Sequence, residues 1–330
     1  MSALRDKIFH GLEVVGEESE GEHGHFPDAR PVEELMRYGF IPLDKPAGQP
    51  SHQVMAWVRQ ILGVSRAGHS GTLDPQATGL LPIGINEATK ALTTLLIGPK
   101  QYYTVMRLHS PVPEAELDAV LSEFVGEIYQ RPPQRSSVRR VTRTKAIYRM
   151  EKVSRSGNLV LLRVLCQAGT YVRKLVYDMG EVLGVGATMV ELRRTRVSDV
   201  SEEGGLVRLH ELALSMRRYR EGGGEEGVRK VVWPIESALG HLKPLVAKDS
   251  AVDSVCHGAQ LAVPGVARAH AELSTGDTVA LYTQKGELVA VGQALLGIQE
   301  LREVQKGLAM KAGRVIMRAG TYPKEWKSSD

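Results

Sequence analysis

The sequence RAGHSGTLDPQATGLLPIGINEATK, from Arg66 to Lys90, raises the first question about this protein. Its part GHSGTLDPQAT, residues 68–78, places two glycines, a histidine, a proline and a single carboxylate, Asp74, in eleven positions. An aspartate followed by proline often starts a helix, with the aspartate as the cap and the proline in the first turn. The alternative is a catalytic carboxylate, and the rest of the chain has to decide between the two.

Common enzyme motifs do not fit this stretch. GVSRAGHS, residues 63–70, is close to a phosphate-binding loop, but His69 stands where that loop needs a lysine. GHSGT is not a nucleophile elbow, because that turn needs a glycine two positions after the serine. His23 and His25 form a pair in an acidic segment, where solvent-exposed histidines are more common than a zinc site. We therefore expect no metal and no nucleotide cofactor.

Composition sets the class of protein. The chain has 330 residues, of which 42% are apolar and 24% are charged, and this is enough for two folded domains. No stretch is apolar for long enough to cross a bilayer, and the N-terminus lacks a secretion signal. We expect a cytoplasmic protein without a membrane anchor. Cys166 and Cys256 stand far apart, and we predict that both are small buried hydrophobic residues.

Charge is unevenly distributed along the chain. Residues 1–30 carry seven acidic and three basic side chains and no sustained apolar period, which indicates an arm. Residues 131–150 contain seven basic residues and no acidic one, and residues 302–327 contain seven basic and two acidic ones. Two basic clusters favour a polyanion such as a nucleic acid as the partner. A solvated surface without a partner would give the same pattern.

Local patterns predict the elements of the first 184 residues. Residues 40–62 read as a short strand, a Pro/Gly turn and a helix capped by Ser51, whose apolar face comprises Val54, Trp57, Val58, Ile61 and Leu62. Residues 101–110 read as a strand, and residues 146–169 as a hairpin that turns at Ser156 and Gly157. Thr170 is a suitable cap for a helix that continues through Leu183 and ends at Gly184.

The remaining part of the chain has a different character. RRYREGGGEEGVRK, residues 217–230, has no core-forming pattern, and we predict a flexible loop. After Lys243 the sequence changes to short alternating strands with Gly-Asp and Lys-Gly turns, as in GDTVALYTQKGELVAVGQAL, residues 276–295. This pattern predicts a small β module.

Five motifs together resemble the TruB family of pseudouridine synthases. They are LDKPAGQPSH (43–52), the Arg66–Lys90 stretch quoted above, KQYYTV (100–105), AGTYVRKLVYDMG (168–180) and ELRRTRV (191–197). The resemblance extends from Gly39 to about Val200. Residues 258–270, 276–292 and 306–326 resemble a PUA domain, a β-barrel-like RNA-binding fold. With the basic stretch 131–150, these features resemble the archaeal relatives of dyskerin, the catalytic subunits of H/ACA guide-RNA particles.

The resemblance implies a fold and a domain plan. We expect an α+β catalytic domain with a mixed, largely antiparallel sheet and flanking helices, followed by the β-barrel-like PUA domain. The expected boundaries are an acidic arm at 1–35, the catalytic domain at 36–243, the PUA domain at 244–325 and a tail at 326–330. We also expect the arm to fold back on the PUA domain.

The resemblance also assigns roles to individual residues. Asp74 would be the catalytic aspartate and Arg173 its ion-pair partner. Tyr102 would be the ring that stacks on the target base, and it is also a candidate for taking the C5 proton. Tyr103 is larger than the small apolar residue expected beside it, so the sequence leaves open which ring faces the base. His69 would lie against the displaced nucleotide, and Leu192 would be an apolar residue of the substrate-binding pocket. Lys45, with Pro46, would bind or support the substrate from the floor of the site.

The implied reaction is the isomerisation of uridine to pseudouridine without metal or cofactor. A carboxylate either adds to C1′ of the sugar or removes the 2′ proton, and the sequence does not choose between these routes. The leading hypothesis is an H/ACA guide-directed enzyme of rRNA processing and ribosome biogenesis, with guide RNA, substrate RNA and small ribonucleoprotein proteins as partners. The alternatives are a stand-alone tRNA pseudouridine(55) synthase and a non-catalytic RNA-binding scaffold.

Overall fold

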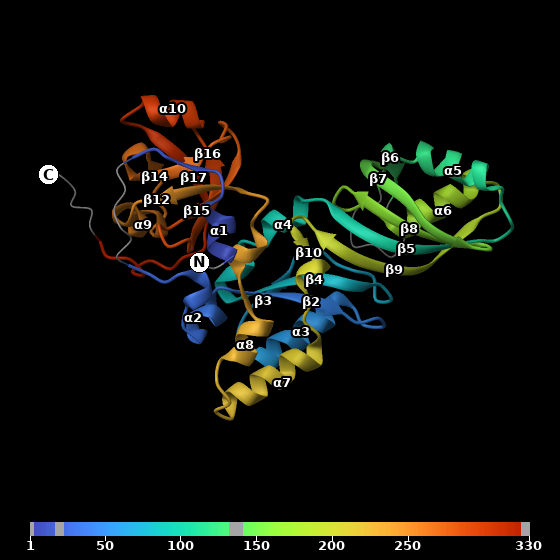
Figure 1. Ribbon diagram of the computed structural model, residues 1–330, viewed down its shortest axis with the longest axis horizontal. Helices are drawn as coiled ribbons and strands as arrows, with labels where there is room; N and C mark the ends of the chain where they lie inside the picture. The colour runs from blue at the N-terminus through green and yellow to red at the C-terminus, as the bar shows by residue number, and fades with distance from the viewer. Residues whose placement is uncertain (1–2, 17–22, 132–140, 325–330) are drawn as a thin grey trace.

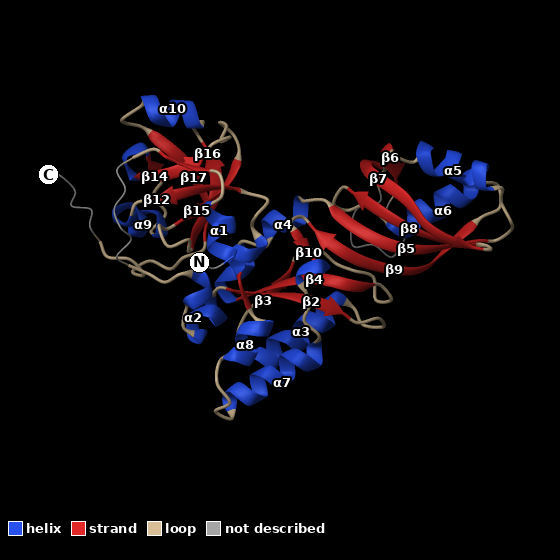
Figure 2. Ribbon diagram, in the orientation of Figure 1, coloured by secondary structure: helices blue, strands red, loops and turns tan. Residues whose placement is uncertain are grey.

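The computed structural model describes residues 3–16, 23–131 and 141–324, which form two β-sheets and the helices around them. The larger sheet has the strand order β11-β2-β4-β9-β5-β8-β7-β6, with β3 paired to β4 and β10 to β9. The smaller sheet has the order β1-β14-β12-β15-β16-β17-β13. In the V seen in Figures 1 and 2, the smaller sheet lies in the left arm, and the larger sheet extends from the angle, where β2, β3 and β4 lie above α3, α7 and α8, into the right arm. This is the α+β architecture expected from the sequence.

The larger sheet is mixed and largely antiparallel, with β4 and β9 running parallel. Its strands are β2 (Gly39–Lys45), β3 (Ala67–His69), β4 (Thr78–Ile85), β5 (Lys100–Leu108), β6 (Gly126–Gln130), β7 (Arg143–Ser156), β8 (Leu159–Cys166), β9 (Ala187–Val197), β10 (Val200–Ser201) and β11 (Trp233–Pro234). The associated helices are α2 (Val32–Arg37), α3 (Ser51–Leu62), α4 (Thr93–Ile97), α5 (Glu114–Glu123), α6 (Val172–Val182), α7 (Leu209–Arg220) and α8 (Glu226–Val231).

The two halves of this sheet meet where β4 lies beside β9. Only two register pairs join these strands, Thr78 with Arg193 and Gly79 with Arg194. Gly79 has φ +95°, and a Cβ atom there would lie 2.3 Å from the backbone oxygen of Arg194. Glycine is therefore required at this position both by its backbone conformation and by the close approach of the neighbouring strand.

Several elements match their sequence patterns. Strand β5 alternates between buried and partly exposed residues, and its buried face packs against a core that includes Leu175 and Met179 of α6. The β7–β8 hairpin turns at Gly157, which has φ +60°. The apolar residues predicted for one face of α3 all lie in one hydrophobic cluster with α7 and α8, with Trp57 and Ile61 at its edge.

Both predicted helix caps are wrong. Helix α3 begins at Ser51 itself, and the buried Ser51 hydroxyl bonds to the backbone of Leu73 instead of to its own helix. Helix α6 begins at Val172, and the Thr170 hydroxyl donates to the carbonyl of Gln167. Serine and threonine hydroxyls can satisfy either a helix end or a neighbouring turn, and sequence alone does not show which partner is within reach.

The predicted loop at residues 217–230 is also wrong. Helix α7 continues to Arg220, and α8 occupies Glu226–Val231, so that only residues 221–225 connect them. Ion pairs at i,i+4 spacing support these helices, among them Arg217–Glu221 and Lys230–Glu226. The sequence showed no apolar pattern here because α8 is short and buries only Val228 and Val231, which are too few to form a visible period.

The C-terminal module is the β-rich unit predicted after Lys243. The Gly276-Asp277 pair precedes β15, and Lys285-Gly286 lies in the turn between β15 and β16. The module comprises β12 (Lys243–Ala247), α9 (Asp249–Cys256), β13 (Leu261–Ala262), β14 (Val266–His270), β15 (Thr278–Tyr282), β16 (Leu288–Ala294), α10 (Ile298–Glu303) and β17 (Leu308–Val315). Short 3-10 turns complete the chain at Pro27–Ala29, Asn86–Lys90, Glu202–Gly204, Ile235–Ala238 and Val263–Gly265.

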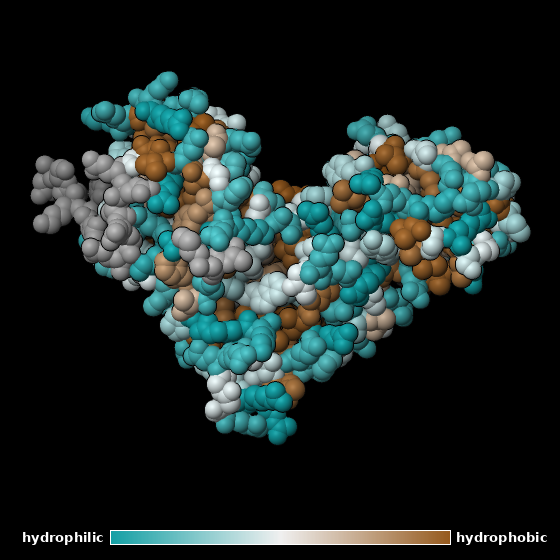
Figure 3. Space-filling view, viewed as in Figure 1, coloured by the Kyte–Doolittle hydropathy of each residue, from teal (hydrophilic) through white to brown (hydrophobic). Residues whose placement is uncertain are grey.

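The N-terminal arm folds back on this module, as expected. It contains α1 (Ala3–Phe9) and β1 (Leu12–Val14), and β1 pairs antiparallel with β14 at the edge of the smaller sheet. The sheets also share a core, because Ile8 of α1 and Phe40 of β2 lie in one cluster with Tyr282 and Leu288 of the C-terminal module. On the face shown in Figure 3, hydrophilic residues cover most of the surface, and hydrophobic ones form small patches in the angle of the V and on both arms.

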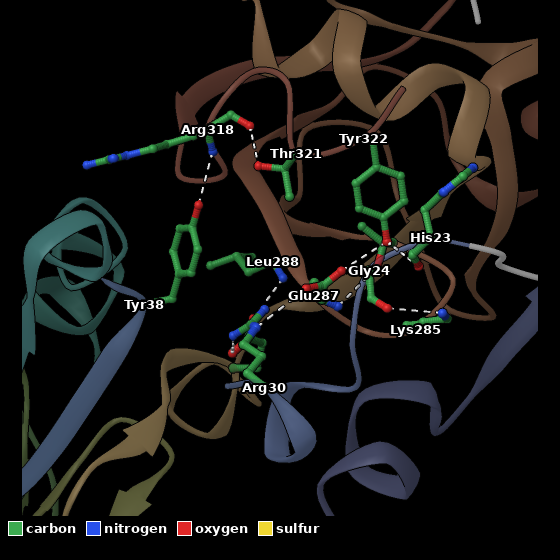
Figure 4. Close-up of polar contacts among 12 residues, drawn as sticks. His23, Gly24, Arg30, Tyr38, Lys285, Glu287, Leu288, Arg318, Thr321 and Tyr322 are labelled. Atoms are coloured by element: carbon green, nitrogen blue, oxygen red, sulfur yellow. Dashed lines mark hydrogen bonds and ion pairs between the residues drawn. The ribbon is translucent and has the colours of Figure 1, made fainter. Parts of the chain in front are cut away.

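A buried charged network joins the arm to both sheets (Figure 4). Arg30 donates to Glu236 in the connection between the sheets and pairs with Glu287 in the β15–β16 turn. Glu287 also accepts from the Tyr322 hydroxyl, and Glu236 accepts from the backbone of Leu288. Burial raises the pKa of Glu287, with the charge of Arg30 opposing this effect. The arm therefore forms part of the junction between the sheets.

Replacing Arg30 tests this junction. Arg30→Met leaves Glu236 and Glu287 buried without their cation, and we expect the free energy of unfolding to fall by about 3–5 kcal/mol. Chemical denaturation measures the change. Arg217→Met, which removes an exposed i,i+4 pair on α7, is the matched control and should have a much smaller effect. Equal effects of the two substitutions would contradict the structural role of the network.

Candidate active site

Asp74 lies in the loop between β3 and β4. The preceding residue, Leu73, is buried, and Ser51 binds both of its backbone groups. The Ser51 Oγ accepts from the Leu73 N–H at 2.9 Å and donates to the Leu73 carbonyl. The carbonyl of Asp74 accepts from the N–H of Ala77 at 3.0 Å, which closes a β-turn with Pro75 in its second position. No helix follows, so Asp74 is not a helix cap, and its side chain remains 46% exposed.

Arg173 forms an ion pair with Asp74, as the sequence predicted. The guanidinium comes from the first turn of α6 and donates to the Asp74 carboxylate across 99 positions of sequence. Both side chains are accessible, with Arg173 58% exposed. The pair joins the half of the sheet that carries β4 to the half covered by α6. It fixes the orientation of a carboxylate that remains open to a ligand.

Tyr102 lies on the face of β5 that points toward α6. Its ring belongs to the hydrophobic core with Leu73 and Val172, and 8% of the residue is exposed. Burial raises the pKa of the Tyr102 phenol, while the nearby charge of Arg194 opposes the rise. The phenol is therefore protonated at neutral pH and suits stacking better than proton abstraction. Tyr103 points to the opposite face of β5, beside Arg163, so that Tyr102 is the ring on the side of the hydrophobic core.

Lys45 lies at the floor of the site, beneath the Asp74 loop. The residue at the end of β2 is fully buried, and its ammonium donates to the carbonyls of Pro46, Pro75 and Ala77 at 2.8–2.9 Å. These three bonds use all the N–H donors of a lysine. Two of the acceptors, Pro75 and Ala77, stand one and three positions after Asp74 in the sequence. Lys45 therefore holds the Asp74 loop from below, which is the supporting role expected for it, and its ammonium has no N–H left for a substrate.

Arg194 is a residue that the sequence reasoning did not single out. It lies opposite Tyr102 in the β5–β9 register and is 1% exposed. Its Nε donates to the carbonyl of Leu80 at 2.9 Å, and its Nη2 donates to the carbonyl of Gly71 at 3.0 Å. The burial pattern of β9 does not alternate and gave no signal, because Arg194 and Thr195 are both buried, while the preceding Arg193 pairs with Asp44 and Glu202.

The structure places His69 and Leu192 near this centre. His69 ends β3, and burial lowers its pKa, with a smaller contribution from the charge of Arg194, so the imidazole is neutral at pH 7. Leu192 lies opposite Thr104 on the same strand pair as Tyr102 and Arg194, and it packs against the same core as Tyr102. His69 thus stands at the start of the Asp74 loop, and Leu192 packs on the core to which Tyr102 belongs.

The cysteines and histidines outside this centre show no further catalytic grouping. Burial raises the pKa of both Cys166 and Cys256 to about 12, and both thiols are free. Cys166 is buried as predicted, whereas Cys256 is only partly so. Across residues 3–16, 23–131 and 141–324, no three His, Cys, Asp or Glu side chains are grouped so as to hold a metal ion. None of the helices in these ranges has the length and apolar character of a membrane span.

Protein-family models match four parts of the chain. Residues 59–116 match the TruB family pseudouridylate synthase (N terminal domain), and residues 173–240 match the tRNA pseudouridylate synthase B C-terminal domain. Residues 243–316 match the PUA domain, and residues 15–55 match the DKCLD (NUC011) domain. The first two matches include Asp74 and Arg173, which form the ion pair described above.

Known proteins are similar over nearly the whole chain. A protein of Methanopyrus kandleri described as "Probable tRNA pseudouridine synthase B" is 50% identical over 309 residues, which are 94% of this chain and 91% of that protein. A chain in the structure of an H/ACA RNP bound to a substrate RNA containing 2'-deoxyuridine has a TM-score of 0.89 and 43% identity, covering 96% of this chain and 97% of that chain. A chain in a Cbf5-Nop10-Gar1 complex has a TM-score of 0.88 and 45% identity, covering 95% and 96%.

Lys45→Met tests how the Asp74 loop is held. The substitution leaves three carbonyls without their donor, and we expect the free energy of unfolding to fall by about 1–3 kcal/mol for each acceptor that remains buried. Hydrogen exchange at the Ala77 amide, which closes the Asp74 turn, should accelerate. Lys90→Met is the control, because Lys90 forms a partly exposed pair with Glu87 outside the loop. Unchanged exchange at Ala77 would show that Lys45 does not support this turn.

Proposed function

This chain belongs to the TruB family of pseudouridylate synthases, and we propose that it isomerises RNA uridines under the direction of an H/ACA guide RNA, with Asp74 as the catalytic carboxylate. The family inferred from the sequence motifs is thereby confirmed, and the enzyme is an isomerase. The observation that carries the assignment of the site is the accessible Asp74 carboxylate, paired with Arg173 close to the Tyr102 ring.

The reaction breaks the bond between uracil N1 and C1′, turns the base and joins its C5 to C1′. Asp74 is the group that acts on the sugar, either by adding to C1′ or by removing the 2′ proton to form a glycal. Both routes need an oriented carboxylate. Arg173 provides this orientation and leaves nearly half of the Asp74 side chain accessible for the approach of the sugar.

Tyr102 retains the base while it is detached from the sugar. We propose that uracil stacks on the protonated phenol ring of Tyr102, which is 8% exposed in the structure without RNA, because rotation of the base needs a flat contact and no fixed hydrogen bond. The target uridine must first leave its own stack, which costs a few kcal/mol. We propose that His69, as a neutral imidazole, and Leu192, as an apolar side chain, contact the displaced nucleotide.

Guide RNA is the partner that best fits the C-terminal half. The proposed PUA domain, residues 244–325, follows the catalytic domain at 36–243 and precedes a tail at 326–330. The proposed arm, 1–35, packs on it through β1, and the PUA match at 243–316 agrees with a change of domain near residue 243. The similar H/ACA RNP chain is bound to substrate RNA, and the other similar chain is assembled with Nop10 and Gar1. We propose small proteins of this kind as partners here, in the cytoplasm.

Two kinds of basic residue occur in the described part of the region 302–327. In the region 302–327, Arg302 pairs with Glu13 and Arg318 with Glu87, so these two stabilise contacts within the chain. Lys306, Lys311 and Arg314 lie exposed around β17. Residues 132–140 of the other basic region lie outside the described residues. The exposed group is the one that we propose for contact with RNA phosphates.

A stand-alone tRNA enzyme is the second candidate function. It is favoured by the relative described as a probable tRNA pseudouridine synthase B, which aligns over 94% of this chain. The third candidate, a scaffold without catalysis, does not explain why an accessible carboxylate is paired with an arginine near a tyrosine. We therefore retain rRNA and tRNA as alternative substrates of one active site.

Asp74→Asn tests the catalytic assignment. We expect release of tritium from uridine labelled at C5 to fall to background, because an amide neither adds to C1′ nor accepts a proton. The assay compares a tRNA T-arm alone with an rRNA fragment, its matched guide RNA and the partner proteins. Asp118→Asn, which alters an exposed carboxylate paired with Lys152, is the control and should retain the wild-type rate. Wild-type release from the Asp74 variant would refute the mechanism.

Charge reversal on β17 tests the RNA contact. For the Lys311→Glu and Arg314→Glu double variant we expect weaker guide-RNA binding, and the slope of log K against log salt should decrease by about 0.9 for each duplex phosphate that the protein no longer neutralises. Filter binding across a salt series measures this slope. Lys230→Glu on α8 reverses an exposed charge on the catalytic side and is the control. An unchanged slope for the β17 variant would show that the guide binds elsewhere.

A further inference from the structure

Gln130 makes an unusual pair of contacts at the end of β6. It is the last residue of that strand and is 2% exposed. Its Oε1 accepts from the backbone N–H of Tyr171 at 2.9 Å, and its Nε2 donates to the backbone carbonyl of the same residue at 3.2 Å. The side-chain amide thus binds both backbone groups of one residue, as a neighbouring β-strand would. Two such bonds fix the position and the direction of the Tyr171 backbone.

Tyr171 is the residue immediately before α6. The first N–H groups of a helix have no partner within the helix, so contacts from outside determine where the helix starts. Two neighbouring contacts act on the preceding turn: Lys145 donates to the carbonyl of Ala168 at 2.7 Å, and the Gln167 N–H donates to the carbonyl of Ala146 at 2.8 Å. The start of α6 is therefore fastened to β6 and β7.

Arg173, two residues after Tyr171, extends from this fastened start to Asp74. Asp74 belongs to the β3–β4 loop on the other side of the β4–β9 junction. The Arg173 guanidinium therefore reaches the Asp74 carboxylate only if the start of α6 and the β3–β4 loop both keep their positions. We propose that Gln130 is a positioning residue for the isomerisation reaction: by fixing the Tyr171 backbone, it places the Arg173 guanidinium against the catalytic carboxylate.

A role in filling space alone does not account for the choice of side chain. A methionine of similar length would fill the same volume but could not bind the Tyr171 N–H and carbonyl together. Gln130 is also too buried to bind RNA directly. Its replacement should therefore slow the chemical step and leave RNA affinity unchanged. A misplacement of about 1 Å in a reacting group can cost about 100-fold in rate, and an effect of about 10- to 100-fold is expected here.

The test is a double-mutant cycle on the full chain, in whichever substrate mixture supports tritium release by the wild type. Gln130→Met and Arg173→Met are measured singly and together under single-turnover conditions, with RNA affinity measured separately. Gln130→Glu is a second variant, because a carboxylate accepts from the Tyr171 N–H but repels its carbonyl. Gln101→Met is the matched control. Gln101 is a partly buried amide on the face of β5 opposite to Tyr102, and it donates to the hydroxyl of Thr195.

The expected result is an about 10- to 100-fold slower reaction for Gln130→Met, normal RNA affinity, and no further decrease when Gln130→Met is added to Arg173→Met. Gln130→Glu should be slow as well, and Gln101→Met should react at the wild-type rate. Additive effects in the double variant, or weaker RNA binding, would overturn the proposal. The inference depends on the role proposed for Arg173. A wild-type rate for Arg173→Met would refute that role, whereas a slow Arg173→Met with a wild-type Gln130→Met would refute the inference alone.

Discussion

Strands β4 and β9 approach so closely at Gly79 that a single added carbon would lie 2.3 Å from the backbone of Arg194. The organisation of the active site depends on this contact. The two register pairs there join a half-sheet that carries the Asp74 loop to a half-sheet that carries Tyr102 and, through α6, Arg173. The Arg194 guanidinium extends back across the same junction to Gly71 and Leu80. One close strand contact thus determines how the carboxylate from one half meets its partners from the other.

Local patterns in the sequence predicted the elements whose stability is local. The alternation of β5, the β7–β8 turn at Gly157 and the apolar face of α3 follow from side-chain period and glycine conformation. The errors concern choices between nearby partners. Ser51 binds Leu73, 22 residues away, instead of capping its own helix, and residues 217–230 gain helical structure from ion pairs and from burial of Val228 against another helix. Neither choice can be made before the tertiary structure is known.

The residues of the candidate active site fall into the same two classes, those predicted from the sequence and those that needed the tertiary structure. Asp74, Tyr102 and Arg173 were identified through resemblance, and only the structure shows which tyrosine faces the core. The supporting residues were missed or only partly assigned because their partners are backbone carbonyls, which leave no mark in a sequence. The sequence left open whether Lys45 binds or supports the substrate, and its three acceptors are carbonyls around the Asp74 turn. Arg194 and Gln130 act on backbone atoms 123 and 41 positions away.

An exposed ion pair contributes little to stability, typically about 0–1 kcal/mol, because water screens its charges and both side chains lose freedom. The Asp74–Arg173 pair, with about half of each side chain exposed, therefore cannot hold two half-sheets in place. Its geometry has to be imposed from both sides by buried contacts, which are Lys45, Ser51 and Arg194 on the loop and Gln130 on the start of α6. This division has a chemical advantage. A carboxylate held by its backbone instead of by deep burial stays accessible to the sugar of a nucleotide, while its position is as well defined as that of a core residue.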